Sequence, residues 1–315
     1  MLFRRRMIFS LACLGCLFMS WSYLADRTGS YHVVHGWPQL PEGFALGQVS
    51  GVDVDSHNHV FVFHRGDRPI LCFDGDTGKI AASWGDGMFV RAHGLKVDDQ
   101  DNIWVTDIGH HQVFKFSHDG SLLMTVGARD VPGLDGNHFN QPTDVAVAPS
   151  AEFYVSDGYG NSRVAKFSKE GRFLFDWGRK GGQPGEFDLP HGIALDSQGR
   201  VYVADRTNSR IQVFDGNGKF LHEWKSTELG RPWGLRVAAD GYLYVVDGGD
   251  MNPKPPDRGQ VLKLDLQGKI LEKFGSFGSY DGQFYWAHAV GIAKNGDVYV
   301  TDVHVGMRVQ KFVRR

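Results

Sequence analysis

The stretch Val201-Tyr-Val-Ala-Asp205 decides the fold, because close copies of it recur along the chain at a spacing of about 40–50 residues. Each copy is rich in Val and aromatic residues and ends in Asp. The other copies are Ile103-Trp-Val-Thr-Asp107, Phe153-Tyr-Val-Ser-Asp157, Leu243-Tyr-Val-Val-Asp247 and Val298-Tyr-Val-Thr-Asp302. A second apolar stretch follows, such as Ile211-Gln-Val-Phe214, and then a turn such as Asp215-Gly-Asn-Gly218. Short alternating stretches bounded by such turns are typical of antiparallel strands. Four strands in a repeat form one propeller blade, so the sequence predicts an all-β propeller.

The chain contains six copies of this repeat, which together predict a six-bladed β-propeller over residues 31–315. The copies start near Gly47, Met88, His138, Glu186, Glu228 and Gln283. The last copy stops at Lys311-Phe-Val313, after its third strand, and we expect the N-terminal stretch Tyr31–Trp37 to supply the missing outer strand. Ring closure of this kind shields the edges of the sheets. The repeats resemble NHL repeats.

Residues 1–25 differ from the rest of the chain. Arg4-Arg-Arg6 precedes an apolar run from Met7 to Leu24, which predicts either a secretory signal peptide or an uncleaved membrane anchor. In both cases we expect the propeller to lie outside the cytoplasm, secreted or attached to a membrane. The propeller contains a single cysteine, Cys72, which we expect to be a buried apolar residue rather than a reactive thiol.

The charge balance argues against one class of partner. Lys and Arg number 34 and Asp and Glu 36, which gives a formal net charge of -2 without a basic stripe. Nucleic-acid binding proteins carry such a stripe, so we expect no nucleic-acid partner.

Three histidines stand at the same position of every second repeat. They are His93, His191 and His288, whereas the corresponding stretches of the intervening repeats, Gln141-Pro-Thr and Arg231-Pro-Trp, lack histidine. In a closed ring of six blades, alternate copies point at the axis from directions a third of a turn apart. Three imidazoles that converge in this way predict a metal site with open coordination positions. The residues alone leave zinc, iron and manganese open as the bound ion.

Residues that follow the second strand of each repeat should surround the same mouth, because the start of one antiparallel strand lies beside the end of the next. Arg65, Tyr159 and Arg206 occupy such positions. The arginines are suited to hold a carboxylate by paired N–H donors, and the tyrosine to act as general acid or base. Three further histidines near the mouth are expected to lie outside the ligand set: His110, His111 and His304.

Several of these stretches together resemble the peptidyl-α-hydroxyglycine α-amidating lyase family, from about residue 40 to the end of the chain. They are Gln48-Val-Ser-Gly-Val52, His64-Arg-Gly-Asp67, His93-Gly-Leu95, Asn137-His-Phe-Asn-Gln-Pro-Thr-Asp-Val145, Val155-Ser-Asp-Gly-Tyr159, Asn161-Ser-Arg163 and Val203-Ala-Asp-Arg206. The resemblance implies a six-bladed propeller that holds zinc through His93, His191 and His288. It also implies that Tyr159, Arg65 and Arg206 are catalytic. The implied reaction splits a carbinolamide, from a peptide or a small molecule with a carboxylate, into an amide and glyoxylate.

The chain departs from the family pattern at a second metal site. The resemblance implies a structural calcium held by the backbone carbonyls of Val52 and Leu95 and by an aspartate after the third histidine. That aspartate is Ala289 here, so calcium lacks its charged ligand. Trp286 also replaces a methionine of the family, which alters the pocket beside His288.

Two alternatives stay open on the sequence. The same site suits a related lyase or hydrolase that acts on another small carboxylate substrate. A non-catalytic NHL propeller displayed outside the cytoplasm, as a binding platform, is the alternative of another class.

Overall fold

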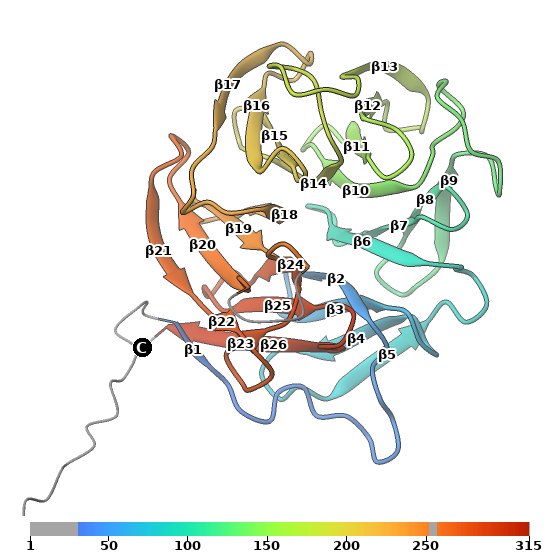
Figure 1. The fold of residues 1–315 in the computed structure, drawn as a ribbon. Coiled ribbons are helices and arrows are strands. Elements are labelled where there is room, and N and C mark those ends of the chain that lie inside the picture. The colour runs from blue at the N-terminus through green and yellow to red at the C-terminus, as the bar shows by residue number, and fades with distance from the viewer. Residues whose placement is uncertain (1–30, 252–256, 315) are drawn as a thin grey trace, which may run out of the picture.

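The computed structural model describes residues 31–251 and 257–314, and every regular element within them is a strand. Twenty-four of these strands form six four-stranded antiparallel sheets, which surround a central axis like the blades of a propeller (Figure 1). The predicted all-β, six-bladed architecture is therefore confirmed. The expected signal peptide or anchor at residues 1–25 lies outside the described residues. No helix in the described ranges is long and apolar enough to cross a bilayer.

Each blade runs outward from the axis in chain order, except that β1 forms the outermost strand of blade six. Blades one to three comprise β2 (Val49–Val54), β3 (His59–His64), β4 (Ile70–Asp74) and β5 (Ile80–Trp84); β6 (Ala92–Val97), β7 (Ile103–Asp107), β8 (Gln112–Phe116) and β9 (Leu122–Val126); and β10 (Pro142–Val147), β11 (Phe153–Asp157), β12 (Arg163–Phe167) and β13 (Phe173–Trp177). Blades four and five comprise β14 (Pro190–Leu195), β15 (Val201–Asp205), β16 (Arg210–Phe214) and β17 (Phe220–Trp224); and β18 (Pro232–Val237), β19 (Leu243–Asp247), β20 (Gln260–Leu264) and β21 (Ile270–Phe274). Blade six comprises β24 (Ala287–Ile292), β25 (Val298–Asp302), β26 (Arg308–Arg314) and β1 (Tyr31–Val33), and a short parallel pair, β22 (Ser276–Phe277) and β23 (Gln283–Phe284), precedes it.

The two ends of the described chain close the ring in blade six. β1 pairs antiparallel with β26, and Tyr31 lies opposite Arg314. This confirms that an N-terminal strand completes the ring, although the strand ends at Val33 rather than continuing to Trp37. The chain turns at Gly36, which has a φ of 76°, and Trp37 packs instead between the rings of Phe73 and Tyr299. Closure therefore uses a short strand and a buried indole.

The apolar core lies between neighbouring blades. The middle strands bury their side chains on both faces, whereas the outer strands, such as β9, expose most of theirs. Trp104, Tyr202, Tyr244 and Tyr299 are among the largest fully buried residues. Cys72 is buried as predicted, and burial raises the pKa of its thiol to about 12. The site is thus built on a rigid framework.

The aspartate that ends the second strand has a structural role, because it holds the segment that leads into the first strand of its own blade. The Asp107 carboxylate accepts hydrogen bonds from the backbone N–H groups of Val90 and Arg91, at 2.8 and 3.0 Å. Asp157 and Asp302 bind the corresponding segments in the same way. These contacts fix the loops from which the axial side chains emerge.

His64 takes the place of that aspartate in blade one. Its Nδ1 accepts a hydrogen bond from the Gly47 N–H at 3.0 Å, and its Nε2 donates to the Arg68 carbonyl at 3.1 Å. The imidazole must be neutral to do both, and burial lowers its pKa accordingly. His64 thereby positions the next residue, Arg65, at the mouth.

Candidate active site

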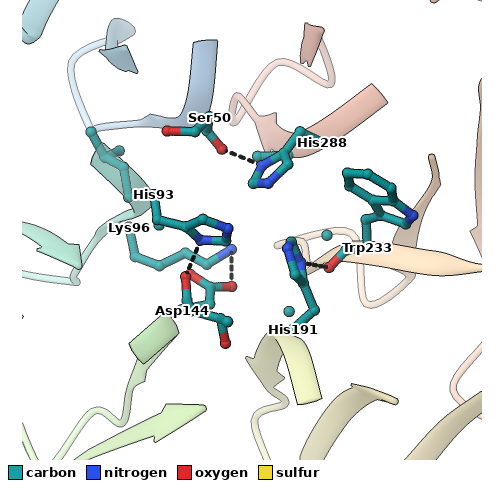
Figure 2. A pocket seen from close by; sticks show the side chains of 13 residues that line it. Ser50, His93, Lys96, Asp144, His191, Trp233 and His288 are labelled. Carbon is teal, nitrogen blue, oxygen red and sulfur yellow. Dashed lines mark hydrogen bonds and ion pairs between the residues drawn. The ribbon is translucent and has the colours of Figure 1, made fainter. Parts of the chain in front are cut away.

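The three predicted histidines meet on the axis of the propeller. His93, His191 and His288 are each the second residue of an innermost strand, β6, β14 and β24, and all three are buried. Figure 2 shows their rings turned toward one another around the axis. One nitrogen from each ring lies within 4.8 Å of the others, which is a spacing that a single metal ion can bridge.

The blades without histidine orient these rings. Each Nδ1 donates a hydrogen bond to a backbone carbonyl at the corresponding strand position of the following blade. The acceptors for His93, His191 and His288 are Thr143, Trp233 and Ser50, at 2.6, 2.9 and 2.6 Å. Because a carbonyl can only accept, Nδ1 carries the proton and the lone pair of Nε2 points to the axis. Both sets of alternate blades therefore contribute to the site.

Burial keeps the three imidazoles neutral. It lowers the pKa of His93 and His191 well below the usual value and that of His288 to about 3, and nearby positive charges act in the same direction. The buried Nε2 of His288 has no hydrogen-bond partner among the described residues. Neutral nitrogens whose lone pairs are directed at one point are the donors that zinc, iron and manganese accept. The residues present thus fit the metal that the sequence implied.

Tyr159 lies beside this centre. It follows β11, and its hydroxyl is 3.0 Å from Nε2 of His93 and 3.2 Å from Nε2 of His191. The loop is compact at the next residue, where Gly160 N donates to the Asn140 carbonyl at 2.9 Å. A Cβ at Gly160 would stand 2.1 Å from the side chain of Asn140, so a larger residue would require that side chain to move. The phenol can therefore reach a group held by the histidines.

The two predicted arginines reach the same mouth. Arg65 donates from Nε to the Ala92 carbonyl at 3.0 Å and from Nη1 to Gln48 Oε1 at 2.6 Å. The Arg206 guanidinium lies over the Trp233 ring, with its central carbon 3.5 Å from the ring centroid. Both cations interact electrostatically with the Tyr159 hydroxyl. The predicted set of three histidines, a tyrosine and two arginines is thus brought together in space.

Neither Arg65 nor Arg206 forms an ion pair with a carboxylate in the part of the chain that the structure describes. Burial lowers the pKa of both guanidinium groups. Repulsion from Arg91 acts on Arg65 in the same direction, and repulsion from Arg231 acts on Arg206. Partly buried cations that form no ion pair favour an anionic ligand.

Some residues of the site were not predicted, above all Trp233. Its carbonyl orients His191, its ring carries Arg206, and it also contacts the ring of His288 at a centroid distance of 5.7 Å. A signal was available, because Trp233 stands in repeat five at the position that is histidine in repeats two, four and six. Gln48, which holds Arg65, carried no comparable signal.

The three further histidines near the mouth stay outside the ligand set. His110 pairs with Asp130 at 2.6 Å, and the Nδ1 of His111 accepts a hydrogen bond from the Gln141 N–H at 3.0 Å. His304 packs on Trp286 with ring centroids 4.4 Å apart. Trp286 and Trp233 share one small apolar cluster, which forms an aromatic wall next to His288.

A lysine occupies the axis on the inner side of the histidines. A small cavity extends from the three imidazoles to Lys96 (Figure 2), and Leu95 and Ala289 also line it. The Lys96 ammonium donates to the Leu235 carbonyl at 3.0 Å and lies 3.4 Å from the Asp144 carboxylate. With a fixed positive charge in this cavity and no carboxylate at Ala289, these residues do not fit the calcium ion that Val52 and Leu95 would share in the family.

Comparison with known proteins agrees with the repeat and identifies relatives. The NHL repeat is recognised at residues 89–116, 139–167 and 187–214. The chain is 32% identical over 292 residues to the probable peptidyl-α-hydroxyglycine α-amidating lyase of Caenorhabditis elegans, a match that covers 82% of this chain and 80% of the relative. It is 32% identical to the peptidyl-α-hydroxyglycine α-amidating lyase 2 of Drosophila melanogaster, over 89% of this chain and 75% of the relative.

A longer relative contains the same region as one of its parts. The peptidyl-glycine α-amidating monooxygenase B of Xenopus laevis is 36% identical over 305 residues, which covers 85% of this chain and 34% of the relative. The chain thus spans about a third of the length of this relative.

Among solved structures, a streptogramin B lyase matches with a TM-score of 0.63 and 15% identity, covering 90% of this chain and 98% of that one. A gluconolactonase of Xanthomonas campestris matches with a TM-score of 0.64 and 16% identity, over 93% of both chains. At these identities the two structures agree with the fold alone.

Proposed function

Because the chain belongs to the peptidyl-α-hydroxyglycine α-amidating lyase family, we propose that it cleaves the carbon–nitrogen bond of a carbinolamide and releases an amide and glyoxylate. One observation of the structure supports the proposal above the others. Three neutral imidazole nitrogens converge at the mouth where a phenol and two guanidinium groups without carboxylate partners also meet. A non-catalytic binding platform has no need of this combination.

His93, His191 and His288 would hold the metal ion, which we propose to be zinc, with iron or manganese as alternatives. Such an ion, when bound, supplies Lewis-acid chemistry that makes a nearby substrate hydroxyl more acidic. The carbonyls behind the rings, for example that of Thr143, keep the three nitrogens directed at one point.

Tyr159 is the group placed to move protons. The reaction removes a proton from the carbinol oxygen, converts the C–O bond to the carbonyl of glyoxylate, breaks the C–N bond and adds a proton to the departing amide nitrogen. One phenol group can serve both transfers, because its neutral form gives a proton to the departing nitrogen and the phenolate that results takes the proton of the carbinol oxygen, so no co-reactant is needed. The Tyr159 hydroxyl lies within 3.2 Å of two of the histidine nitrogens, next to the point where the substrate oxygen would be held.

Arg65 and Arg206 are the groups placed to hold the substrate carboxylate. Two guanidinium groups can neutralise it and present planar pairs of N–H donors. Arg206 is held flat on Trp233, and Arg65 is fixed by Gln48 and the Ala92 carbonyl, so little side-chain entropy is lost when the anion binds.

The test combines metal analysis with a product assay. Protein comprising residues 26–315, purified without added metal, is analysed for zinc, iron, manganese and calcium and then mixed with α-hydroxyhippurate. We expect one transition-metal ion at the histidines and release of glyoxylate. Metal without glyoxylate would point to a related lyase or hydrolase substrate. Absence of metal after reconstitution would refute the proposal and favour the binding platform.

We further propose an extracytoplasmic location, from the three arginines and the apolar run within residues 1–25. Fractionation of cells that express the full chain tests this. Recovery in the soluble cytoplasmic fraction would contradict it.

A further inference from the structure

A second cluster of metal-ligating side chains lies on the opposite face of the propeller. Asp55 directly follows β2, and His59 begins β3, so both lie at the end of blade one that is remote from the axial histidines. His118 reaches them from the turn that follows β8 in blade two. The Nδ1 of His59 and the Nε2 of His118 are both 2.8 Å from the same oxygen, Oδ2 of Asp55.

We propose that Asp55, His59 and His118 form a binding site for a divalent transition-metal ion such as Zn²⁺, distinct from the site on the axis. One ligand atom from each of the three residues lies within 4.8 Å of the others. Two imidazoles and a carboxylate are a donor set that zinc, copper and nickel accept.

The corresponding aspartates of other blades are satisfied by groups that cannot bind a metal. In blade two, Asp98 Oδ2 accepts hydrogen bonds from Asn102 Nδ2 and from Trp104 Nε1, at 3.1 and 2.9 Å. In blade four, Asp196 Oδ2 accepts from Arg200 Nε at 2.6 Å and from the Tyr202 hydroxyl at 2.9 Å.

Blade one differs at both positions. His59 stands where blades two and four have Asn102 and Arg200, and Phe61, which has no donor, stands where they have Trp104 and Tyr202. The His118 ring packs edge-on against Phe61, at a centroid distance of 5.6 Å, and supplies the missing contact to Asp55. Two imidazoles therefore replace the two side chains that donate hydrogen bonds to the corresponding carboxylate in blades two and four.

Backbone hydrogen bonds fix the Asp55 carboxylate in an orientation that suits a cation. Asp55 is buried, and its Oδ1 accepts hydrogen bonds from the backbone N–H groups of His57 and His59, at 2.8 and 2.7 Å. Oδ2 is left facing the two partly exposed imidazoles. An ion that replaces the two imidazole protons needs only a small rotation of these rings, because donors bonded to zinc at about 2.0–2.2 Å stand roughly 3.3 Å apart.

A fourth ligand is available in the same turn. The exposed His57 ring lies 6.2 Å from the rings of both His59 and His118, measured between centroids. It can complete a tetrahedral set by rotation of its side chain, or water can take that position. The ion would join the β2–β3 turn of blade one to the β8–β9 turn of blade two, and so connect two neighbouring blades.

The experiment counts zinc on the untagged full-length chain, by competition with a chromophoric chelator, and compares single variants. We expect His59→Asn and His118→Asn each to bind one equivalent of zinc fewer than wild type, and zinc to raise their unfolding temperature less. The control is His35→Asn, which removes a surface histidine paired with a single carboxylate, Asp281, at 2.6 Å. It should bind as much zinc as wild type.

Circular dichroism and thermal unfolding without metal show whether each variant is folded. Because two histidine variants are measured independently, the test still holds if one of them does not fold. Equal zinc counts in wild type, His59→Asn and His118→Asn would overturn the proposal. The cluster would then be a set of histidine–carboxylate hydrogen bonds only. Loss of one equivalent in His35→Asn as well would also overturn it, because the ion would then be bound by scattered surface histidines.

Discussion

The ammonium group of Lys96 lies 3.4 Å from the carboxylate of Asp144 inside the propeller, on the axis that also carries the three histidines (Figure 2). The pair joins the innermost strands of blades two and three, and Lys96 reaches across the axis to the Leu235 carbonyl of blade five. Both side chains are at least 90% buried. The Lys96 side chain thus places a positive charge in the cavity where the family pattern implies calcium, and its contacts connect three blades.

The first prediction follows from this burial. Lys96→Met leaves the Asp144 carboxylate without its partner, and removal of one member of a buried pair typically costs about 3–5 kcal/mol of unfolding free energy. Urea unfolding measures the loss. The double variant Lys96→Met with Asp144→Asn should recover part of it, because no unpaired charge remains.

For the wild-type chain, a chelator selective for calcium should leave the unfolding temperature unchanged. A decrease that added calcium reverses would show that Lys96 does not replace the ion.

The second prediction concerns the axial histidines. His191→Ala removes one of three converging nitrogens, and we expect loss of the axial metal ion and of glyoxylate release. Metal analysis and the product assay check both. His222→Ala is the matched control, because His222 lies on the outer strand β17, away from the axis, and should retain both.

The third prediction separates proton transfer from metal binding. Tyr159→Phe keeps the ring and removes the hydroxyl that lies 3.0 Å from His93 Nε2. Metal content should be unchanged, and kcat should fall by about 10²–10⁴-fold, the usual contribution of a positioned acid or base. Turnover close to that of wild type would remove Tyr159 from the mechanism.

The fourth prediction tests whether Arg206 binds the carboxylate of the substrate. Arg206→Gln removes a buried cation that has no carboxylate partner in the described ranges, so kcat/KM for α-hydroxyhippurate should fall by about 10²–10³-fold. The same change should matter much less for an analogue in which the carboxylate is a carboxamide. The control Arg179→Gln breaks only the surface pair with Glu186 and should leave both values unchanged. An equal loss for both substrates would show that Arg206 does not bind the carboxylate.

The fifth prediction concerns pH. His64 is neutral in the folded chain, with its pKa lowered by burial, so the unfolded chain binds one more proton as the pH falls below about 6.5. Its contribution to stability is therefore complete above that pH and is lost as the pH decreases toward the folded pKa. His64→Asn, whose side chain does not titrate, should show a shallower loss below pH 6.5, by at most about 1.4 kcal/mol per pH unit. Urea unfolding at pH 7.5 and 5.0 measures the difference, and equal slopes would contradict the assignment.

The strand pattern, the ring and most of the site were predictable from local sequence, because each depends on a short repeat with a fixed geometry. Copies such as Val201–Asp205 specify a strand by the alternation of their side chains between two faces. Antiparallel pairing then places the residue that follows this strand at the mouth of the propeller. Six copies imply a closed ring, and a closed ring makes residues as distant as His93 and His288 neighbours. That reasoning located the histidines, Tyr159, Arg65 and Arg206 without any contact being known.

Other features depend on side chains that meet across blades, which no local pattern encodes. The tautomer of His191 follows from the Trp233 carbonyl one blade away, and the face of that buried indole determines where Arg206 lies.

The Lys96–Asp144 pair and the cluster of Asp55 with His118 likewise join residues that are 48 and 63 positions apart, on different blades. The sequence by itself therefore determined the architecture and which histidines lie on the axis. The tertiary structure decided protonation, orientation and charge pairing, because these depend on distances of a few ångströms between blades that only the folded ring brings together.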